Sequence, residues 1–487
     1  MLLTSIRRDW SANPMREMLA GAVATFALIP EVIAFSFVAG VDPEVGLFAS
    51  FVIGIVIAFT GGRPAMISAA AGSVALVAAP LVHAHGLPYL FAAGLLAGLM
   101  QIAFGLLRLG VLMRFVSKSV RTGFVNALAI LIFAAQMPHI IGVGWIEYAV
   151  LIAGLAIIYL TPRITTAIPS PLICILILTV ASVSFGLPVL TVADLGKLPD
   201  SLPVFGWPAV PLTLETLRII AGPALAIAMV GLLESMMTAS VVDDLTDTPS
   251  SKNRECTGLG LANAAASLFG GIAGCGMIGQ TVSNVKYGGR GRLSTLFAGA
   301  FLLILMVLLK PWVSQVPVAA LVAIMVMVSI DTFDWSSLRA VVVHPRMSSA
   351  VMVATVIVTV FTANLALGVT VGVLLSGVFF TFKVASLLRV DVAPNTAGRL
   401  IYRVSGQVFF ASADVFVEAF DVQDAVGKTV LIDVSEAHFW DITAVAALDK
   451  VVQRFGAHGI AVDIAGLNQA SATLIGSLDS KVALKEV

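Results

Sequence analysis

Residues 270–289 read GGIAGCGMIGQTVSNVKYGG, and this stretch decides how the chain folds. Its glycine-rich beginning disfavours a helix, and only about ten residues follow before the next basic loop, whereas a helix needs about 20 residues to cross a 30 Å hydrocarbon core. We predict an extended segment that reaches the middle of a membrane and continues there as a half-helix. Such irregular backbone is stable in a membrane only where protein or a cavity covers it.

A second stretch of the same kind lies at residues 68–86. The run SAAAGS at 68–73 precedes an apolar stretch of only about fourteen residues, which is again too short to span as a helix alone. Broken segments at corresponding places in two halves of a chain are typical of inverted-repeat transporters, and they mark the binding site.

Two acidic residues support this pairing of the halves. Glu31 lies 42 residues before Ser73, and Glu234 lies 42 residues before Gly276, each in the middle of an apolar segment. A carboxylate inside the bilayer costs at least about 2.5 to 3.5 kcal/mol on insertion scales, so it is a functional candidate by default. Burial away from cations favours a protonated carboxyl group, which would let Glu234 carry a proton. The alternative for both acids is a hydrogen-bonded structural role.

The whole chain has the composition of a membrane protein. Of its 487 residues 59% are hydrophobic and 11% are charged, whereas about a quarter of the residues are charged in soluble domains. We predict an α-helical integral membrane protein with 14 transmembrane segments in a 7+7 inverted repeat, with repeats near 1–195 and 205–389. The segments lie near 18–40, 44–60, 73–86, 90–107, 122–141, 148–161, 168–186, 219–241, 257–272, 279–288, 294–309, 317–330, 350–363 and 366–385.

The distribution of basic residues predicts the orientation. With the N-terminus inside, 18 Lys and Arg side chains of residues 1–390 fall at cytoplasmic positions and only Lys197, Arg218 and Lys310 fall outside, as the positive-inside rule requires. We expect a multi-pass protein of the inner (plasma) membrane with cytoplasmic N- and C-termini. No cleavable signal peptide is evident.

The tail is a separate domain by composition. Residues 391–487 hold 19 of the 56 charged side chains and carry a net charge of −5, against +5 for residues 1–390. We therefore predict a transmembrane transport domain at 1–390 and a cytoplasmic α/β domain at 391–487. Its expected strands are 400–404, 407–410, 429–434 and 459–465, and its expected helices are 442–455 and 468–478.

The two half-helix beginnings predict an anion site. Free backbone N–H groups and the positive ends of two helix dipoles can hold an anion without a basic side chain, and no Lys or Arg is expected in the middle of the membrane. The alternative is that the glycine-rich breaks only pack helices closely. The predicted substrate-binding residues are Glu31, Phe35, Phe37, Gly72, Ser73, Val74, Ile278, Gly279, Gln280 and Thr281, and the predicted proton-coupling residue is Glu234.

No catalytic residue, metal site or cofactor is expected. The three cysteines, Cys174, Cys256 and Cys275, lie far apart without metal-type spacing, and we interpret them as packing residues. Neither part of the chain carries a polybasic run for nucleic acid.

Four stretches resemble bacterial members of the sulfate permease (SulP) family of anion transporters. They are PEVIAFSFVAGVDPEVGLFASF at 30–51, VGLLESMMTASVVDD at 230–244, the run 253–271 followed by 276–289, and IDVSEAHFWDITAVAALDKV at 432–451. The resemblance implies a fourteen-segment inverted repeat with core and gate parts, similar to uracil-permease-like carriers, and a C-terminal STAS domain. It also implies homodimers in membrane lipid and substrates such as sulfate, bicarbonate, halides or dicarboxylates.

The resemblance also implies roles for single residues. Glu234 matches the acid that the family links to coupling, and the backbone around Ser73 and Gly279 matches its anion site. Animal relatives often have Arg where this chain has Gln280, which favours proton symport over exchange. The phosphorylated serine of related STAS proteins corresponds to Ile442, so that switch is absent, although Thr443 lies next to it.

The function predicted from the sequence is therefore transport, not enzymatic catalysis. We predict proton symport of a small anion, which is a dicarboxylate such as fumarate or succinate, sulfate or bicarbonate. The alternatives are an anion exchanger or channel of the same fold, a membrane-anchored sensor, or a nucleobase and proton symporter. The last would be expected to carry an acidic residue at 277–289, where there is none.

Overall fold

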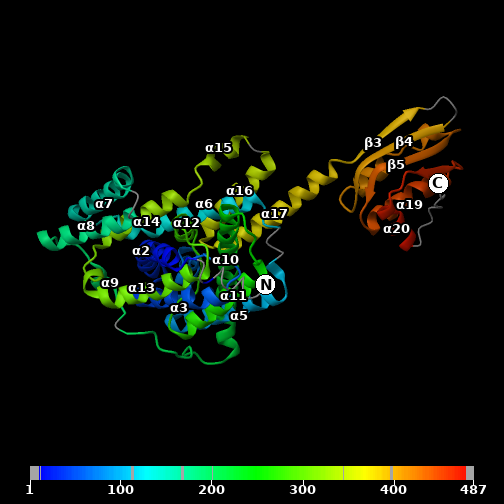
Figure 1. Ribbon diagram of the computed structural model, residues 1–487. Helices are drawn as coiled ribbons and strands as arrows, with labels where there is room; N and C mark the ends of the chain where they lie inside the picture. Colours follow the sequence, from blue (N-terminus) through cyan, green and yellow to red (C-terminus); the bar gives the residue numbers. More distant parts are fainter. Residues whose placement is uncertain are drawn as a thin grey trace. The chain divides into compact units, whose positions relative to one another are not determined.

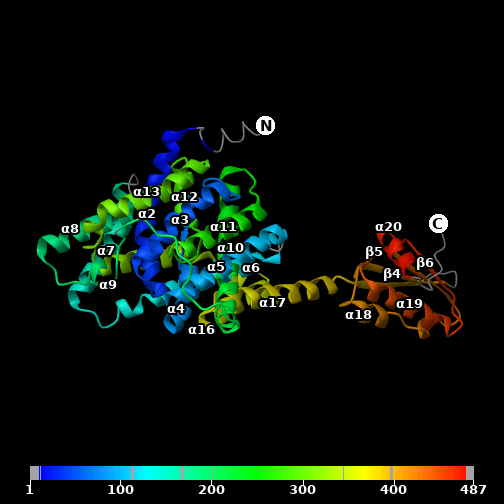
Figure 2. The same cartoon turned by 90° about the horizontal axis from the view of Figure 1, so that it is seen from below.

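A computed structural model of the chain describes residue 10 and residues 13–110, 115–165, 169–199, 201–343, 345–394 and 399–478. The chain forms two compact units, Met1–Val373 and Leu374–Val487 (Figures 1 and 2). The first unit contains the apolar helices, the last of which, Leu365–Ala385, continues into the second unit, and the second contains a β-sheet.

The first half of the membrane unit alternates long apolar helices with one broken segment. Its elements are α2 (Pro14–Ala39), α3 (Pro43–Thr60), β1 (Ser68–Ala70), α4 (Gly72–His85), α5 (Leu87–Leu106), α6 (Lys118–Ala135), the 3₁₀ helix η2 (Met137–His139), α7 (Trp145–Ile164), α8 (Ser170–Phe185) and α9 (Val192–Leu195).

The second half repeats this order of elements. It comprises α10 (Leu214–Thr246), α11 (Lys252–Leu268), β2 (Gly274–Gly276), α12 (Ile278–Lys286), α13 (Arg292–Val313), α14 (Val318–Thr332), α15 (Ser336–Val343), α16 (Arg346–Thr362) and α17 (Leu365–Ala385). Each of the fourteen predicted segments falls on a helix, but among the described residues only nine helices are long and apolar enough to cross a membrane by themselves. The count of fourteen spans stays a prediction.

Both broken segments have the predicted form of a strand followed by a half-helix. Strands β1 and β2 pair antiparallel, with Ser68 opposite Gly276 and Ala70 opposite Gly274. The outer edges of this small sheet are also satisfied: Ser50 on α3 accepts the Ala70 N–H at 3.2 Å, and Asn263 on α11 accepts the Gly274 N–H at 2.8 Å. Protein groups therefore replace the water that irregular backbone would otherwise need.

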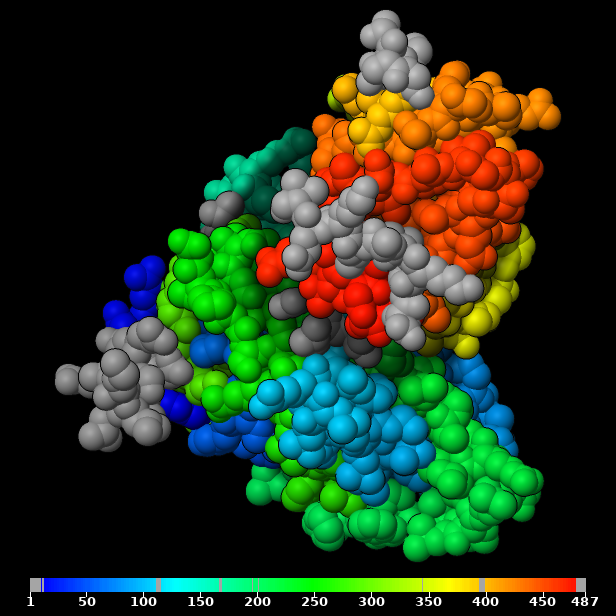
Figure 3. Space-filling model, turned by 90° about the vertical axis from the view of Figure 1, so that its right-hand side faces the viewer, coloured from blue at the N-terminus to red at the C-terminus, as the bar shows by residue number. Residues whose placement is uncertain are grey.

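Helix packing divides the membrane unit into two groups. The first helix group comprises α2 to α5 and α10 to α13, in which α5 packs on α11 and α13 packs on α2 and α3 (Figure 2). The second helix group comprises α6, α7, α8, α14, α16 and α17, in which α6 packs on α14 and α16 and Gly372 of α17 lies against Val120 of α6 and Thr355 of α16. In the space-filling view, the light-blue surface around the end of α5 borders the green surface of the second half (Figure 3).

Glycines allow the helices of the first group to approach closely. A Cβ atom on Gly54 of α3 would lie 2.9 Å from the Cα of Gly299 on α13. A Cβ atom on Gly98 of α5 would lie 2.6 Å from the carbonyl oxygen of Gly260 on α11. Small residues at such crossings give close backbone contact, which is how helices associate within membranes.

A buried arginine in a loop ties the two halves together. Arg63, in the loop between α3 and β1, forms an ion pair with Asp243 at 3.2 Å and donates to the Thr248 carbonyl at 2.9 Å. Burial lowers the pKa of the Arg63 guanidinium from its usual value, and the nearby Asp243 opposes this shift. The first half is thereby fixed to the end of α10.

The C-terminal unit is an α/β domain with a four-stranded sheet in the order β3-β4-β5-β6. Strand β3 is antiparallel to β4, and the other pairs are parallel (Figure 1). Aromatic side chains fill its core, where Tyr402 and Phe420 rings lie 4.7 Å apart. The elements are β3 (Arg389–Pro394), β4 (Arg399–Val408), α18 (Ala413–Glu418), the 3₁₀ helix η3 (Gln423–Ala425), β5 (Thr429–Phe439), α19 (Ile442–Gly456), β6 (Val462–Ala465) and α20 (Gln469–Ser477).

Three details of this unit differ from the sequence prediction. The strands predicted at 400–404 and 407–410 are one continuous strand, β4, because pairing with β5 continues past the irregularity between Arg403 and Ser405. Strand β3 and helix α18 were not predicted. The short alternating stretch at 389–394 becomes a strand through its pairing with β4.

Candidate functional site

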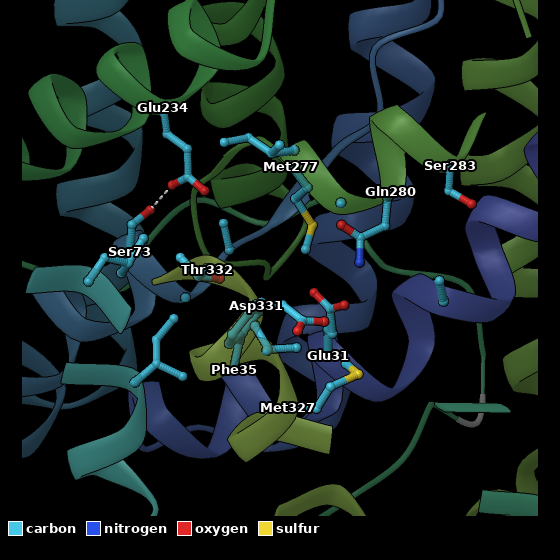
Figure 4. Close-up of a pocket in the computed structure, with 18 of the residues that line it drawn as sticks. Glu31, Phe35, Ser73, Glu234, Met277, Gln280, Ser283, Met327, Asp331 and Thr332 are labelled. Carbon is cyan, nitrogen blue, oxygen red and sulfur yellow. Dashed lines mark hydrogen bonds between the residues drawn. The ribbon is translucent and has the colours of Figure 1, made fainter. Parts of the chain in front are cut away.

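A cavity of about 690 Å³ lies between the two helix groups. Its walls come from α2, α10 and the beginnings of α4 and α12 on one side, and from α6, α8 and α14 on the other. Both half-helices therefore begin at the same cavity. Figure 4 shows the side chains that line it.

Most of the predicted site residues line this cavity. They are Glu31, Phe35, Gly72, Ser73, Glu234, Ile278, Gly279 and Gln280. The structure does not bring Phe37, Val74 and Thr281 into the lining.

Helix geometry explains why these three residues lie elsewhere. Residues two apart on a helix do not share a face, so Phe35 faces the cavity while Phe37 lines a separate cavity of about 30 Å³ beside Gln136. Val74 is fully buried. Thr281 faces the strand pair, where its hydroxyl accepts the Ile67 N–H at 2.9 Å.

Glu234 is held at the beginning of α4. Its Oε2 atom accepts hydrogen bonds from the Ser73 hydroxyl (Figure 4) and from the Cys275 thiol, the latter at 3.1 Å. The backbone of α10 is fixed next to it, because the Thr238 hydroxyl contacts the carbonyl oxygens of Glu234 at 2.9 Å and Gly276 at 2.8 Å. Cys275 is thus more than the packing residue that we predicted.

Glu31 makes the corresponding contact with the other half-helix. Its carboxyl group and the Gln280 side chain in the first turn of α12 point toward one another (Figure 4). The arrangement is crossed: the first helix of each half contacts the half-helix of the other half. Both acids are half-buried at the cavity wall.

The beginnings of α4 and α12 present backbone N–H groups to the cavity. In the described part of the chain no side chain caps either helix at Ala71 or Met277. A helix beginning carries about half a positive elementary charge and leaves its first N–H groups available to an anion. A Cβ atom on Gly279 would meet nothing within 4 Å, so the N-terminus of α12 opens into the cavity.

Sequence reasoning missed two charged residues of the lining. Lys286 at the end of α12 and Asp331 near the end of α14 are exposed and line the cavity where it reaches the surface. The missed signal was helical spacing: Gln280, Ser283 and Lys286 recur every three residues and therefore follow one face of α12. Asp331 follows Met327 by four residues in the same way.

Comparisons with known proteins agree with this architecture. The sequence matches the Sulfate permease family over residues 15–149 and 144–355, and the STAS domain over residues 389–479. It is 51% identical over 471 residues to the "Putative sulfate transporter YbaR" of Bacillus subtilis (strain 168), covering 97% of this chain and 98% of that protein. It is 27% identical over 497 residues to the "Bicarbonate transporter BicA" of Picosynechococcus, covering 91% of this chain and 86% of that one.

Two solved structures have the same fold. The transmembrane domain of a cyanobacterial bicarbonate transporter BicA superposes with a TM-score of 0.65 at 26% identity, over 73% of this chain and 97% of that one. The murine anion transporter Slc26a9 superposes with a TM-score of 0.84 at 18% identity, over 96% of this chain and 88% of that one. The second likeness shows the fold alone.

Proposed function

The chain belongs to the sulfate permease family of membrane anion transporters and carries a C-terminal STAS domain, and we propose that it moves a small oxyanion, sulfate or bicarbonate, together with protons. The observation that supports this most is the single cavity in which two half-helix N-termini and two glutamates meet. The names of the relatives point to sulfate and bicarbonate.

The anion binds at the two helix N-termini in this proposal. Together they supply about one positive elementary charge without a basic side chain at the site. A cavity of 690 Å³ has room for about twenty water molecules, so a small oxyanion keeps part of its hydration shell. A fumarate or succinate dianion would also fit, and it is the competing substrate class.

Glu234 couples the anion to a proton. Its hydrogen bond to Ser73 places the carboxyl group at the first turn of α4, where an ionised carboxylate repels an arriving anion. Protonation removes this repulsion, so that proton and anion occupy the site together. The buried acid favours symport over a channel, for which it would have no use.

Alternating access follows from the two helix groups. We assign the first helix group as the core and the second as the gate of a fourteen-span 7+7 inverted repeat, within a transport domain at 1–390. The cavity reaches the surface at Lys286, on the side of Arg290 and of Arg292 at the start of α13, which the positive-inside rule assigns to the cytoplasm. The conformation is then inward-facing, with both termini cytoplasmic.

The STAS domain, residues 391–487, serves assembly of a homodimer in this proposal. Asp441 caps α19 by accepting the Ala444 N–H at 2.8 Å, and Ile442 occupies the exposed position after it. Since Ile442 has no hydroxyl group, phosphorylation at this position cannot act as the switch. Thr443 is exposed next to it and offers the competing hypothesis.

Uptake of radiolabelled sulfate into proteoliposomes with an imposed pH gradient tests the proposal. An inward proton gradient should stimulate uptake by the parent and should stimulate Glu234→Gln much less. The matched control is Glu215→Gln, because Glu215 lies exposed on the same helix and outside the cavity lining. Equal uptake by Glu234→Gln and the parent at every gradient would refute the coupling role.

A further inference from the structure

We propose that Glu31 is a second proton-binding residue, so that a dianion such as sulfate crosses the membrane with two protons. This inference rests on the proposed function and adds its stoichiometry. It follows from the crossed contacts at the cavity, from a contrast among the acids of the fold, and from the charge of the lining.

The crossed contacts give the two acids equivalent positions. Helix α2 packs on α12 and α10 packs on α4; Glu31 points toward Gln280 on α12 (Figure 4), and Glu234 accepts a hydrogen bond from Ser73 on α4. Each acid therefore lies beside the first turn of a half-helix whose N-terminus faces the cavity. An anion at these N-termini lies next to both carboxyl groups, so a coupling role argued for Glu234 applies to Glu31 as well.

Two other acids of the first helix group show what a structural glutamate looks like in this fold. Glu17 is 5% exposed and accepts the backbone N–H groups of Arg290 at 2.7 Å and Gly291 at 2.9 Å. Glu255 is fully buried and accepts the backbone N–H groups of Gly62 at 2.7 Å and Arg63 at 3.1 Å. Both bind backbone and remain apart from the cavity lining.

Glu31 and Glu234 differ from that pattern in the same way. Both line the cavity, both are half-buried, and both point toward a side chain at the start of a half-helix. Water and protons in the cavity reach such groups, whereas hydrogen bonds from backbone N–H groups, as at Glu17 and Glu255, favour the ionised form of a carboxyl group. Glu31 thus belongs with the proton-carrying acid.

The charges around Glu31 favour its protonation when an anion is bound. Among the described residues, the ionisable side chains that line the cavity are Glu31 itself, Glu234 on α10, Lys286 on α12 and Asp331 on α14. Helices α3, α4, α8 and α13, which also pack against or near α2, contribute none to the lining. Lys286 and Asp331 are both exposed at the cavity mouth and offset one another.

The charges of the two glutamates, the anion and the helix ends determine how many protons bind together with the anion. Glu31 and Glu234 line the same cavity, and ionising both beside a dianion would place four negative charges against about one positive charge from the two helix ends. Binding a proton to each glutamate halves that negative charge. The complex of one dianion and two protons then crosses without net charge, and the membrane potential does not act on it.

Sulfate accumulation in proteoliposomes under an imposed membrane potential tests this stoichiometry. The parent should reach the same accumulation with and without an inside-negative potential at a fixed pH gradient. Glu31→Gln should carry sulfate with one proton and a net negative charge, so a potential of about 100 mV should lower its accumulation about fiftyfold. Glu234→Gln should behave alike, the double variant should lose its response to the pH gradient, and Glu215→Gln should match the parent.

Proton uptake on sulfate binding to the purified protein in detergent, followed with a pH indicator, gives a readout that does not need transport. We expect two protons per sulfate for the parent and one for Glu31→Gln. If Glu31→Gln does not bind sulfate, Glu31→Asp should restore binding with two protons, and its failure to do so overturns the inference.

The outcomes separate this inference from the proposed function. Unchanged coupling in Glu234→Gln refutes the proposed function. Weakened coupling in Glu234→Gln together with the parental proton number in Glu31→Gln refutes only the role of Glu31. One proton per sulfate in the parent, or no binding of sulfate at all, also refutes the inference.

Discussion

The two half-helices that begin at the cavity differ in their length and in how open their N-termini are. Helix α4 has 14 residues and begins under an aromatic ring, because a Cβ atom on Gly72 would lie 2.6 Å from Cε1 of Phe35. Helix α12 has 9 residues and begins in open space at Gly279. One N-terminus is enclosed and the other is open.

We infer from this difference that the two N-termini have different functions at the site. The enclosed end at α4 holds the Ser73, Glu234 and Cys275 contacts, which suit a group that must bind a proton in a defined geometry. The open end at α12 carries Gln280, Ser283 and Lys286 along the cavity, which suits a hydrated anion.

The largest effect is expected where both half-helices are anchored. In Gly274→Val the new side chain would run into the Ala69 carbonyl across the strand pair, and we expect destabilisation above about 4 kcal/mol, the range of severe core disruption. Size-exclusion chromatography in detergent should show loss of the monodisperse protein. A well-folded Gly274→Val protein would mean that the strand pair does not hold the half-helices.

A matched pair of alanine variants tests the enclosed and open ends directly. Gly72→Ala must displace the Phe35 ring, and we expect anion uptake to fall about tenfold, since such overpacking costs about 1 to 3 kcal/mol. Gly279→Ala meets open space and should stay within about threefold of the parent. Initial uptake rates at a fixed pH gradient measure both, and equal losses would contradict the comparison.

Cys275 offers a smaller effect at the enclosed end. Cys275→Ala removes a hydrogen-bond donor from Glu234, and a donor favours the ionised carboxylate. The proton is then held up to a higher pH, so the midpoint of the pH dependence of uptake should move upward by about one unit or less, as the loss of about 1 kcal/mol implies. Cys275→Ser keeps a hydrogen-bond donor and should move the midpoint less. A downward shift of the midpoint in Cys275→Ala would disprove the role of this contact.

The smallest effect is expected at the open end. Ser283 lines the cavity on α12 and is half-buried, so water can replace its hydroxyl group in Ser283→Ala. We expect the apparent affinity for the anion to change less than about twofold, as measured by concentration-dependent uptake. A loss as large as that of Gly72→Ala would show that the open end binds the anion directly through this side chain.

The sequence predicted the broken segments because their cause is local. Glycine-rich stretches followed by apolar runs too short to span admit few arrangements in a membrane, and β1 with α4 and β2 with α12 confirm the predicted form. The spacing argument was less accurate. The half-helices begin at Gly72 and Ile278, which follow Glu31 and Glu234 by 41 and 44 residues instead of an equal 42.

What the sequence could not predict depends on contacts between distant segments. The orientation of Gln280 toward Glu31 and the hydrogen bond from Ser73 to Glu234 join opposite halves, and no local pattern encodes a partner about 160 to 250 positions away. Phe37 was misplaced for a simpler reason, since its position two residues after Phe35 already excluded a shared helix face. The predicted domain boundary at 390 and the predicted repeats stay predictions.

The pairing of β1 with β2 also constrains how the protein is made. Ser68 must wait for Gly276 to be synthesised before its strand has a partner, and at 5–20 residues per second this takes about 10 to 40 s. If it were inserted during that time, β1 would expose unpaired backbone groups at the middle of the membrane, where each costs several kcal/mol. The first half must therefore remain sheltered, by the insertion machinery or at the membrane surface, until the second half arrives.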